Sequence, residues 1–204
     1  MYKYPSTIDN LIKCYKKLPT IGEKSAIRLA LATLELDDEV IEVFSKSLLE
    51  AKTKIKKCSR CNNITEDDLC DICKDQNRDN KVLCVVDDSK SIVQFEKSES
   101  YNGYYYVLNG LISLENNYNP ENLNIDKMIN IIKQDGIDEI IIAVKPSIEG
   151  ETTALYISKL LESENVKVTR IALGIPLGAD MDYVDSLTLE LAMENRKEII
   201  NEKL

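Results

Sequence analysis

The sequence predicts an α/β protein made of an N-terminal helical region, a short four-cysteine motif, a domain with a largely parallel sheet and a C-terminal helical arm. Three observations predict this order. Apolar residues recur at helical spacing up to residue 55, four cysteines follow, and apolar strand-like runs then alternate with helical segments. The expected boundaries are 1–56, 57–76, 80–172 and 173–204.

The charge of the chain divides near the cysteines. Residues 1–60 carry twelve Lys/Arg and eight Asp/Glu, whereas residues 61–204 carry fourteen and twenty-seven, so the two net charges are +4 and -13. The basic first part favours a nucleic-acid partner although the whole chain has a formal net charge of -9. There is no histidine, which excludes Ser-His and Cys-His catalysis and histidine zinc ligands.

Three helices are expected in the N-terminal region. Their apolar positions are Ile8, Leu11 and Ile12, then Ile27, Ala30, Leu31 and Leu34, then Val40, Ile41, Phe44, Leu48, Ala51 and Ile55. Between the first two helices, Pro19 and Gly22 form a short turn that opens directly into a helix. This is a helix-hairpin-helix pattern.

The turn has the chemistry of a phosphate site. Backbone N–H groups are unpaired at the positive end of the second helix, and Gly22 has no side chain to block close approach. Lys24 and Arg28, four residues apart, share one helix face and add positive charge. We expect DNA binding that tolerates any sequence and weakens with salt. The alternative is an ordinary helical hairpin with a solvated basic face.

Two Cys-x2-Cys pairs, Cys58 with Cys61 and Cys70 with Cys73, have the spacing of a tetrahedral zinc site. The segment that they enclose has few large apolar residues, so a metal has to order it, and structural zinc contributes about 10 to 16 kcal/mol in finger peptides. Four thiolates leave no open coordination position, so we expect one structural Zn²⁺ per chain. A disulfide pair and a redox dithiol are the alternatives.

The remaining two cysteines, Cys14 and Cys84, lie among apolar residues and are expected to be buried thiols.

The second half of the chain alternates between strand and helix patterns. The expected strands are 82–86, 104–108, 140–144 and 168–172, and the expected helices are 125–134, 152–161 and a final one over 185–200. Such alternation is typical of a parallel sheet, whose functional residues gather where the strands end.

Two groups of acidic residues follow these strands. Asp87 and Asp88 come after the first strand, and Glu149 and Glu151 flank Gly150 after a later one. A strand followed by an acid, and another followed by a Glu-Gly step, resemble the Toprim domain of topoisomerases, primases and small nucleases. That domain holds Mg²⁺ for phosphoryl transfer.

The catalytic Toprim pattern is incomplete in this sequence. Catalytic members place an Asp-x-Asp pair just before the Glu-Gly step, and here those positions are Lys145 and Ser147. This places a cation where a metal ligand is expected. We therefore expect no catalytic residue and no enzymatic activity. The alternatives are a Mg²⁺-dependent nuclease or topoisomerase-like enzyme, and a domain that binds a protein or a small molecule.

Further motifs extend the pattern toward the C-terminus. They are Cys84–Val86, Gly103 with Tyr106–Leu108, Thr169–Ala172, Gly174–Gly178, Tyr183–Asp185 and Thr188-Leu189. Together with the hairpin, the four cysteines and the Glu-Gly step, in this order, they resemble the RecR family of bacterial recombination mediators. The resemblance runs from about Leu18 to the C-terminus.

The resemblance implies a non-enzymatic protein that binds DNA and acts with RecO and RecF to promote RecA loading on gapped or single-stranded DNA. It implies a homotetrameric ring that can encircle DNA, with residues 173–204 as an oligomerisation arm. Lys24, Arg28 and Gly22 correspond to the DNA contacts. The acids Asp87, Glu149 and Glu151 correspond to partner binding or support of the fold.

A cytoplasmic, nucleoid-associated protein without a membrane segment is expected, because the N-terminus has no apolar signal core and the longest apolar run is short. Three positions depart from the family pattern. Thr20 replaces a glycine and Glu23 a proline in the hairpin, and Lys145 replaces an asparagine. Because Glu23 is negative, weaker DNA affinity in the absence of partners is expected.

Overall fold

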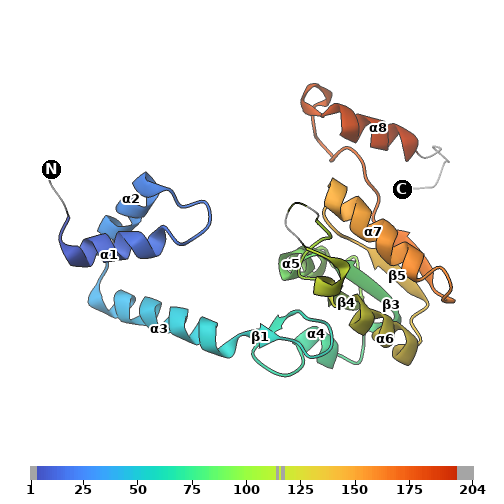
Figure 1. Cartoon of the computed structure of the whole chain (residues 1–204), viewed down its shortest axis with the longest axis horizontal. Helices are drawn as coiled ribbons and strands as arrows, with labels where there is room; N and C mark the ends of the chain where they lie inside the picture. Colours follow the sequence, from blue (N-terminus) through green and yellow to red (C-terminus); the bar gives the residue numbers. More distant parts are fainter. Residues whose placement is uncertain (1–3, 114, 116–117, 197–204) are drawn as a thin grey trace. The chain divides into compact units, whose positions relative to one another are not determined.

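The computed structural model describes residues 4–113, 115 and 118–196. The chain forms two compact units, Met1–Ile55 and Lys56–Leu204 (Figure 1). The first is helical, and the second contains the four cysteines, the sheet and the C-terminal arm. Among the described residues, no helix is long and apolar enough to cross a membrane.

The first unit has the three expected helices, α1 (Ser6–Tyr15), α2 (Glu23–Thr33) and α3 (Asp38–Lys54). Helices α1 and α2 pack through a small core of Ile12, Ala26 and Ala30. The two alanines are fully buried and lie one helical turn apart, so α2 presents a narrow apolar stripe to α1.

Helix α3 has no buried residue, although its sequence has a clear apolar face. Val43 and Leu49 are more than 60% exposed, and Phe44 and Leu48 are also exposed. Most of this apolar face is therefore exposed, and Ile41 is half-buried.

The second unit begins with the cysteine segment. Two short strands, β1 (Lys56–Lys57) and β2 (Ile64–Thr65), pair antiparallel, and the helical turn α4 (Asp71–Lys74) follows. The buried apolar side chains of this segment are those of the four cysteines, with Leu69 and Ile72 packed against them.

The sheet has four parallel strands, β3 (Asp79–Val86), β4 (Gly103–Val107), β5 (Glu139–Ile142) and β6 (Lys167–Arg170), in the order β4-β3-β5-β6. All three neighbouring pairs are parallel. The four expected strands and the parallel sheet are confirmed.

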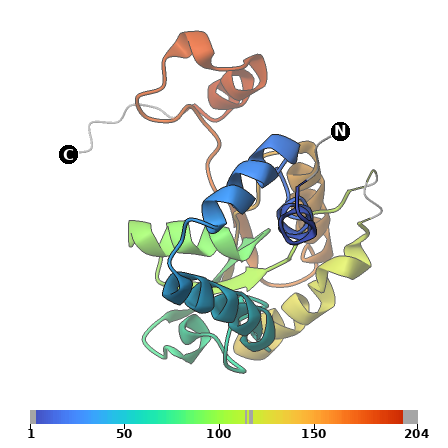
Figure 2. The same ribbon diagram turned by 90° about the vertical axis from the view of Figure 1, so that its left-hand side faces the viewer.

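Helices cover both faces of the sheet. Helices α6 (Ile125–Asp135) and α7 (Ile148–Leu160) pack on one face, and α5 (Ser89–Ser98) packs on the other (Figure 2). Alternation along the central strand β3 explains the division, because Leu83 and Val85 join the α6 and α7 side whereas Cys84 and Val86 join the α5 side. The expected burial of Cys84 is confirmed.

Helix α5 was not expected from the sequence. Its apolar residues are Ile92, Val93 and Phe95, and Ile92 and Phe95 pack against the sheet. Its N-terminus is fixed by the side chain of Asp88, which accepts hydrogen bonds from the N–H groups of Lys90 and Ser91.

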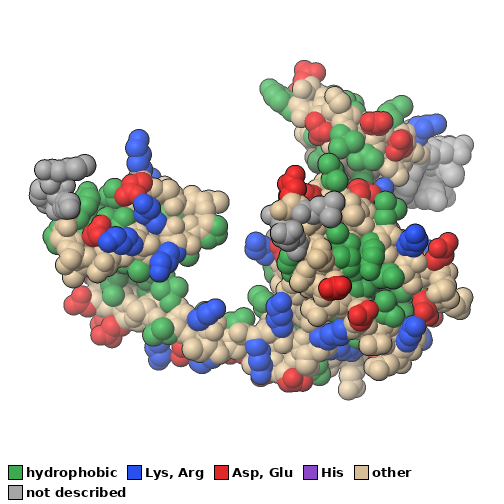
Figure 3. Space-filling model, in the orientation of Figure 1, with side chains coloured by type: hydrophobic (Ala, Val, Ile, Leu, Met, Phe, Trp, Pro, Cys, Tyr) green, Lys and Arg blue, Asp and Glu red, His purple; other side chains and the backbone are tan. Residues whose placement is uncertain are grey.

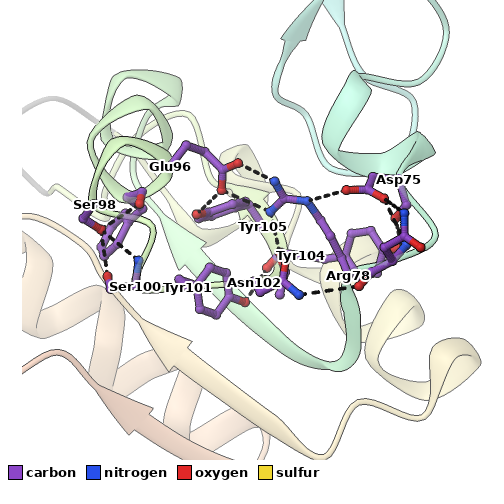
Figure 4. Close-up of polar contacts among 12 residues, drawn as sticks. Asp75, Arg78, Glu96, Ser98, Ser100, Tyr101, Asn102, Tyr104 and Tyr105 are labelled. Atoms are coloured by element: carbon purple, nitrogen blue, oxygen red, sulfur yellow. Dashed lines mark hydrogen bonds and ion pairs between the residues drawn. The ribbon is translucent and has the colours of Figure 1, made fainter.

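A polar network joins the segment before β3 to the α5 side of the sheet (Figure 4). Arg78 donates to Glu96 of α5 at 3.0 Å and to the carbonyl of Gly103 at 3.1 Å. Tyr105 donates to the same Glu96 carboxylate at 2.7 Å. The hydrogen bond from Arg78 lowers the pKa of Glu96, so this carboxylate is ionised.

The C-terminal arm contains the 3₁₀ turn η2 (Met181–Tyr183) and helix α8 (Ser186–Glu194). Neither element has a buried residue, and Leu177 and Tyr183 are 105% and 89% exposed. Helix α8 ends before the expected residue 200, and residues 197–200 lie outside the described part.

Two expectations were wrong. Cys14 is exposed, because it lies two residues after Ile12 and therefore on the opposite face of α1 from the contact with α2. The helix expected at 152–161 begins at Ile148, because the hydroxyl of Ser147 accepts a hydrogen bond from the N–H of Gly150 and caps it.

Candidate functional site

The four cysteines converge on one point. Their sulfur atoms all lie within 4.8 Å of one another, and all four residues are buried. The turn Cys58–Asn63 is closed by two backbone hydrogen bonds, from Cys58 N–H to the carbonyl of Asn63 at 2.7 Å and from Asn62 N–H to the carbonyl of Cys58 at 3.1 Å. The N–H of Cys70 points at the Cys58 sulfur at 3.3 Å.

The crowding of these sulfur atoms separates their pKa values. Hydrogen bonds from neighbouring thiols lower the pKa of Cys70, whereas the hydrogen bonds with Cys70 and Cys61 raise the pKa of Cys61 and Cys73 respectively. All six cysteines of the chain are free rather than disulfide-bonded. A cluster of four buried thiols fits Zn²⁺, which takes four thiolate ligands and needs no other group.

The hairpin presents its two basic residues on the outer face of α2. Ala26 and Ala30 face α1, and Lys24 and Arg28 each lie two residues away from them, so both basic side chains are on the opposite face and exposed. Neither forms an ion pair or a side-chain hydrogen bond with the described residues. Lys and Arg side chains gather over α1 and α2 (Figure 3).

The N-terminus of α2 is open. Its N-cap residue is Gly22, and no side chain caps the first turn. The nearby Glu23 is paired with Lys16, so its charge is offset inside the hairpin. Thr20, in the turn before α2, has a φ of 67°.

The acidic residues of the sheet domain divide between two places. Asp87, Asp88 and Glu149 line one cavity of about 560 Å³ at the carboxyl ends of β3 and β5, together with Lys145 and Ser147. The expectation that acids gather at these strand ends is therefore correct for these three. Glu149 lies in the first turn of α7 rather than in a loop.

Glu151 does not belong to this cavity. It forms an ion pair with Arg170 of β6 and lines a separate hollow beside Val168. Although Glu149 and Glu151 are two residues apart, the helical geometry of α7 directs them to different sides.

Some of the charged side chains in the cavity have hydrogen-bond partners. Ser147 donates to the Glu149 carboxylate at 2.8 Å, and this hydrogen bond, helped by the charge of Lys145, lowers the pKa of Glu149. Lys145 has no ion pair or side-chain hydrogen bond with the described residues. Asp88 is occupied as the cap of α5.

The cavity also contains residues that were not identified from the sequence. Asn109, Gly110 and Tyr118 line it, and the Tyr118 hydroxyl donates to the carbonyl of Asn109 at 3.0 Å. The sequence did contain a signal for Asn109 and Gly110, because this Asn-Gly step directly follows the expected strand 104–108. The carboxyl ends of parallel strands meet at the same edge of the sheet, where functional residues gather.

Comparison with known families gives four matches in chain order. They are the RecR helix-hairpin-helix over residues 8–52, the RecR four-cysteine zinc finger domain over 55–75, the Toprim domain over 81–172 and the RecR C-terminal domain over 174–197. The zinc-finger match and the sulfur geometry agree, so the four cysteines bind one zinc ion. The hairpin match indicates DNA binding. With all four parts present in this order, the chain belongs to the RecR family and has a RecR-type role in DNA repair and recombination.

Proposed function

We propose that this protein is a non-enzymatic recombination mediator that binds DNA without sequence preference and acts with RecO and RecF to promote RecA loading on gapped or single-stranded DNA. The observation that carries the proposal is the open N-terminus of α2 with Lys24 and Arg28 beside it, both exposed and unpaired among the described residues. This arrangement suits a nucleic-acid phosphate.

Gly22 adds support, because nothing in the fold requires glycine there. Its φ of -81° is open to any residue, and a Cβ atom at this position meets no atom within 4 Å. The absence of a side chain therefore leaves room in front of the helix N-terminus, where a phosphate approaches the backbone.

The experiment that tests DNA binding is fluorescence anisotropy over a salt series. The double variant Lys24→Ala with Arg28→Ala removes two positive charges, so the slope of log affinity against log salt becomes shallower by about 1.5. The matched control is Lys90→Ala with Lys97→Ala, which removes the same charge from the exposed surface of α5 and leaves the slope unchanged. An unaltered slope in the hairpin variant contradicts the assignment.

The proposal that the protein is not an enzyme rests on the cavity. Lys145 and Ser147 stand where catalytic Toprim domains carry two aspartates, so a fixed cation lies among the carboxylates. Among the described residues, the four cysteines are the group whose ligand atoms come together within 4.8 Å, and the cavity carboxylates form no such group. Both facts disfavour a tightly held Mg²⁺.

The second candidate function is a Mg²⁺-dependent nuclease or topoisomerase-like activity, which the three carboxylates in one cavity favour. Incubation of supercoiled plasmid with the protein and Mg²⁺ or Mn²⁺ distinguishes the two. The mediator predicts an unchanged plasmid. Nicking or relaxation that disappears in Glu149→Ala establishes the enzyme instead.

We assign Asp87, Glu149 and Glu151 to partner binding. Asp87 and Glu149 share the cavity, whereas Glu151 lies beside β6, so the cavity pair is tested without changing Glu151. Asp87→Asn with Glu149→Gln is expected to weaken binding to RecO while DNA affinity stays unchanged, because the acidic half of the chain attracts a basic partner. Equal RecO binding by the variant and the wild type contradicts the cavity assignment.

We also propose a homotetrameric, nucleoid-associated ring. Exposed apolar side chains support self-association in both units: Val43, Phe44 and Leu49 on α3, and Leu177, Tyr183 and Leu187 in the arm. In this scheme residues 1–56 hold DNA, residues 57–76 bind zinc, residues 80–172 engage partners and residues 173–204 join subunits.

A further inference from the structure

The turn between the first two cysteines covers one edge of the sheet. Strand β4 is the outermost strand on this side, so the outward-facing backbone groups of β4 need partners. The carbonyl of Cys61 accepts a hydrogen bond from the N–H of Val107 at 2.9 Å, and the side-chain amide of Asn62 donates to the Val107 carbonyl at 3.2 Å. A zinc ligand and its neighbour thus satisfy both backbone groups of Val107.

Asn62 is buried and forms hydrogen bonds through both its backbone and its side chain. It is 6% exposed, and its φ of 62° lies in the left-handed region, which asparagine tolerates better than most residues. Its backbone N–H closes the turn onto Cys58, and its side-chain oxygen accepts a hydrogen bond from Lys127 of α6 at 2.7 Å. One residue therefore connects the zinc turn, the edge strand and a helix.

Arg60, in the same turn, makes a second connection to the same two elements. Its guanidinium lies 4.5 Å from the centre of the Tyr104 ring in β4 and donates to Asp135 of α6 at 2.7 Å. The cation and the aromatic ring attract each other, and both side chains of the ion pair are about 30% exposed. The contact between the zinc turn and the sheet thus involves several side chains.

The hydrogen bonds continue from the edge strand to the cavity. The Val107 carbonyl that accepts from Asn62 also accepts from the side chain of Asn109 at 3.2 Å. The next residue, Gly110, donates to the carbonyl of Asp87 at 3.1 Å. Asn109, Gly110 and Asp87 all line the acidic cavity.

We propose that Asn62 is a positioning residue that couples zinc binding to the sheet edge. Zinc fixes the turn, the turn fixes Val107, and the loop 109–110 that lines the cavity is fixed with it. Since coupling free energies are reciprocal, the sheet also strengthens zinc binding by the same factor. Hydrogen-bonded groups around metal ligands typically change metal affinity by about 10- to 100-fold.

Two measurements on the full-length protein test the coupling. Zinc affinity is measured by competition with a chromophoric chelator, and protection of the Val107 amide is measured by hydrogen exchange with zinc present and removed. Asn62→Gly keeps the left-handed backbone and removes the side chain. Asn63→Ala is the control, because among the described residues the Asn63 side chain accepts only a local hydrogen bond, from the N–H of Ile64.

Asn62→Gly is expected to bind one zinc ion with about tenfold weaker affinity. In the wild type, bound zinc is expected to slow hydrogen exchange of the Val107 amide. In the variant, the ratio of the exchange rate without zinc to the rate with zinc is expected to be about tenfold smaller. Asn63→Ala is expected to match the wild type in both measurements.

Zinc affinity equal to wild type in a folded Asn62→Gly protein overturns the proposal. So does wild-type exchange at Val107 that is the same with and without zinc. If Asn62→Gly does not fold, Lys127→Met replaces it, because this change removes the partner of the Asn62 oxygen. It is expected to weaken zinc binding about fivefold, and an unchanged affinity there also overturns the proposal.

Discussion

At the scale of single residues, the hairpin contains a backbone conformation that its residue type disfavours. Thr20 has a φ of 67°, where a β-branched side chain is crowded against its own backbone. The strain lies two residues before Gly22, in the turn that presents the proposed phosphate site.

Thr20→Gly is expected to stabilise the first unit by about 1 kcal/mol, because glycine reaches this φ without steric cost. Hydrogen exchange of the α1 and α2 amides measures this unit separately, and the gain corresponds to about fivefold slower exchange. Gly22→Ala is the comparison variant. Gly22 has a φ of -81°, which any residue adopts, and a Cβ atom there meets no atom within 4 Å. Faster exchange in Thr20→Gly contradicts the assignment of strain to this residue.

The sequence alone predicts the placement of residues that depends only on local structure. The spacing of Lys24 and Arg28 places them on one helix face, and the paired Cys-x2-Cys spacing predicts the zinc cluster. It was not sufficient for Cys14 or Glu151. The exposure of Cys14 depends on which face of α1 meets α2, and the direction of Glu151 depends on where α7 begins.

At the scale of elements, the start of α7 depends on a close backbone approach. A Cβ atom at Gly150 lies 1.9 Å from the carbonyl oxygen of Lys145, so no other residue fits without moving the loop that lines the cavity. The Glu-Gly step therefore has a packing role here in addition to any role of its acid.

Gly150→Ala is expected to destabilise the sheet domain by about 3 kcal/mol, because the overlap is with backbone rather than with a flexible side chain. Urea denaturation followed by circular dichroism measures the change. Gly174→Ala serves as the control, because its Cβ position has no atom within 4 Å. A Gly150→Ala protein as stable as the control rules out the close approach.

The Arg78–Glu96 pair makes the attachment of α5 dependent on pH. The folded-state pKa of Glu96 is lowered below its ordinary value of 4.5, so the pair stabilises the fold above that pH and the contribution disappears as pH falls through the lowered value. Glu96→Gln is expected to cost about 1 to 2 kcal/mol at pH 7.

The measurement is urea denaturation of the wild type and Glu96→Gln between pH 7 and pH 3. The difference in unfolding free energy between them is expected to shrink steadily below pH 4.5. A difference that stays constant over this range shows that the carboxylate charge has no part in the attachment.

The elements that the sequence predicts well are those with dense apolar patterns. Strands β3, β4 and β5 each have a continuous apolar run, whereas β6 has polar Thr169 and Arg170 in it, and the three helices of the first unit have clear periodicity. Helix α5 was missed although it carries the apolar residues Ile92, Val93 and Phe95, and its capping by Asp88 was a further signal. The short strands β1 and β2 depend on the cysteine cluster rather than on their own residues.

At the scale of the whole molecule, each unit leaves apolar surface without a partner. No residue of α3, η2 or α8 is buried, and exposed apolar side chains lie over α7 as well (Figure 3). Exposed apolar surfaces of this kind are consistent with the proposed self-association. The order of the four segments is predictable from the residues, whereas the homotetrameric ring is implied by the family resemblance alone and stays a prediction.

Leu177→Asp with Tyr183→Asp is expected to reduce the size of the assembly, because both side chains are almost fully exposed and belong to the proposed joining arm. Light scattering at several protein concentrations measures the mass relative to the 23.1 kDa chain. Circular dichroism confirms that the variant remains folded. A variant with the same mass as the wild type excludes the arm as a joining surface.

The central claim is that the hairpin allows this protein to mediate RecA loading. The direct test measures RecA assembly on gapped DNA coated with single-strand binding protein, with RecO and RecF present. The wild type is expected to shorten the lag before assembly, and Lys24→Ala with Arg28→Ala to restore the lag seen without the protein. Equal lags with and without the wild type, or full activity of the double variant, contradict the account.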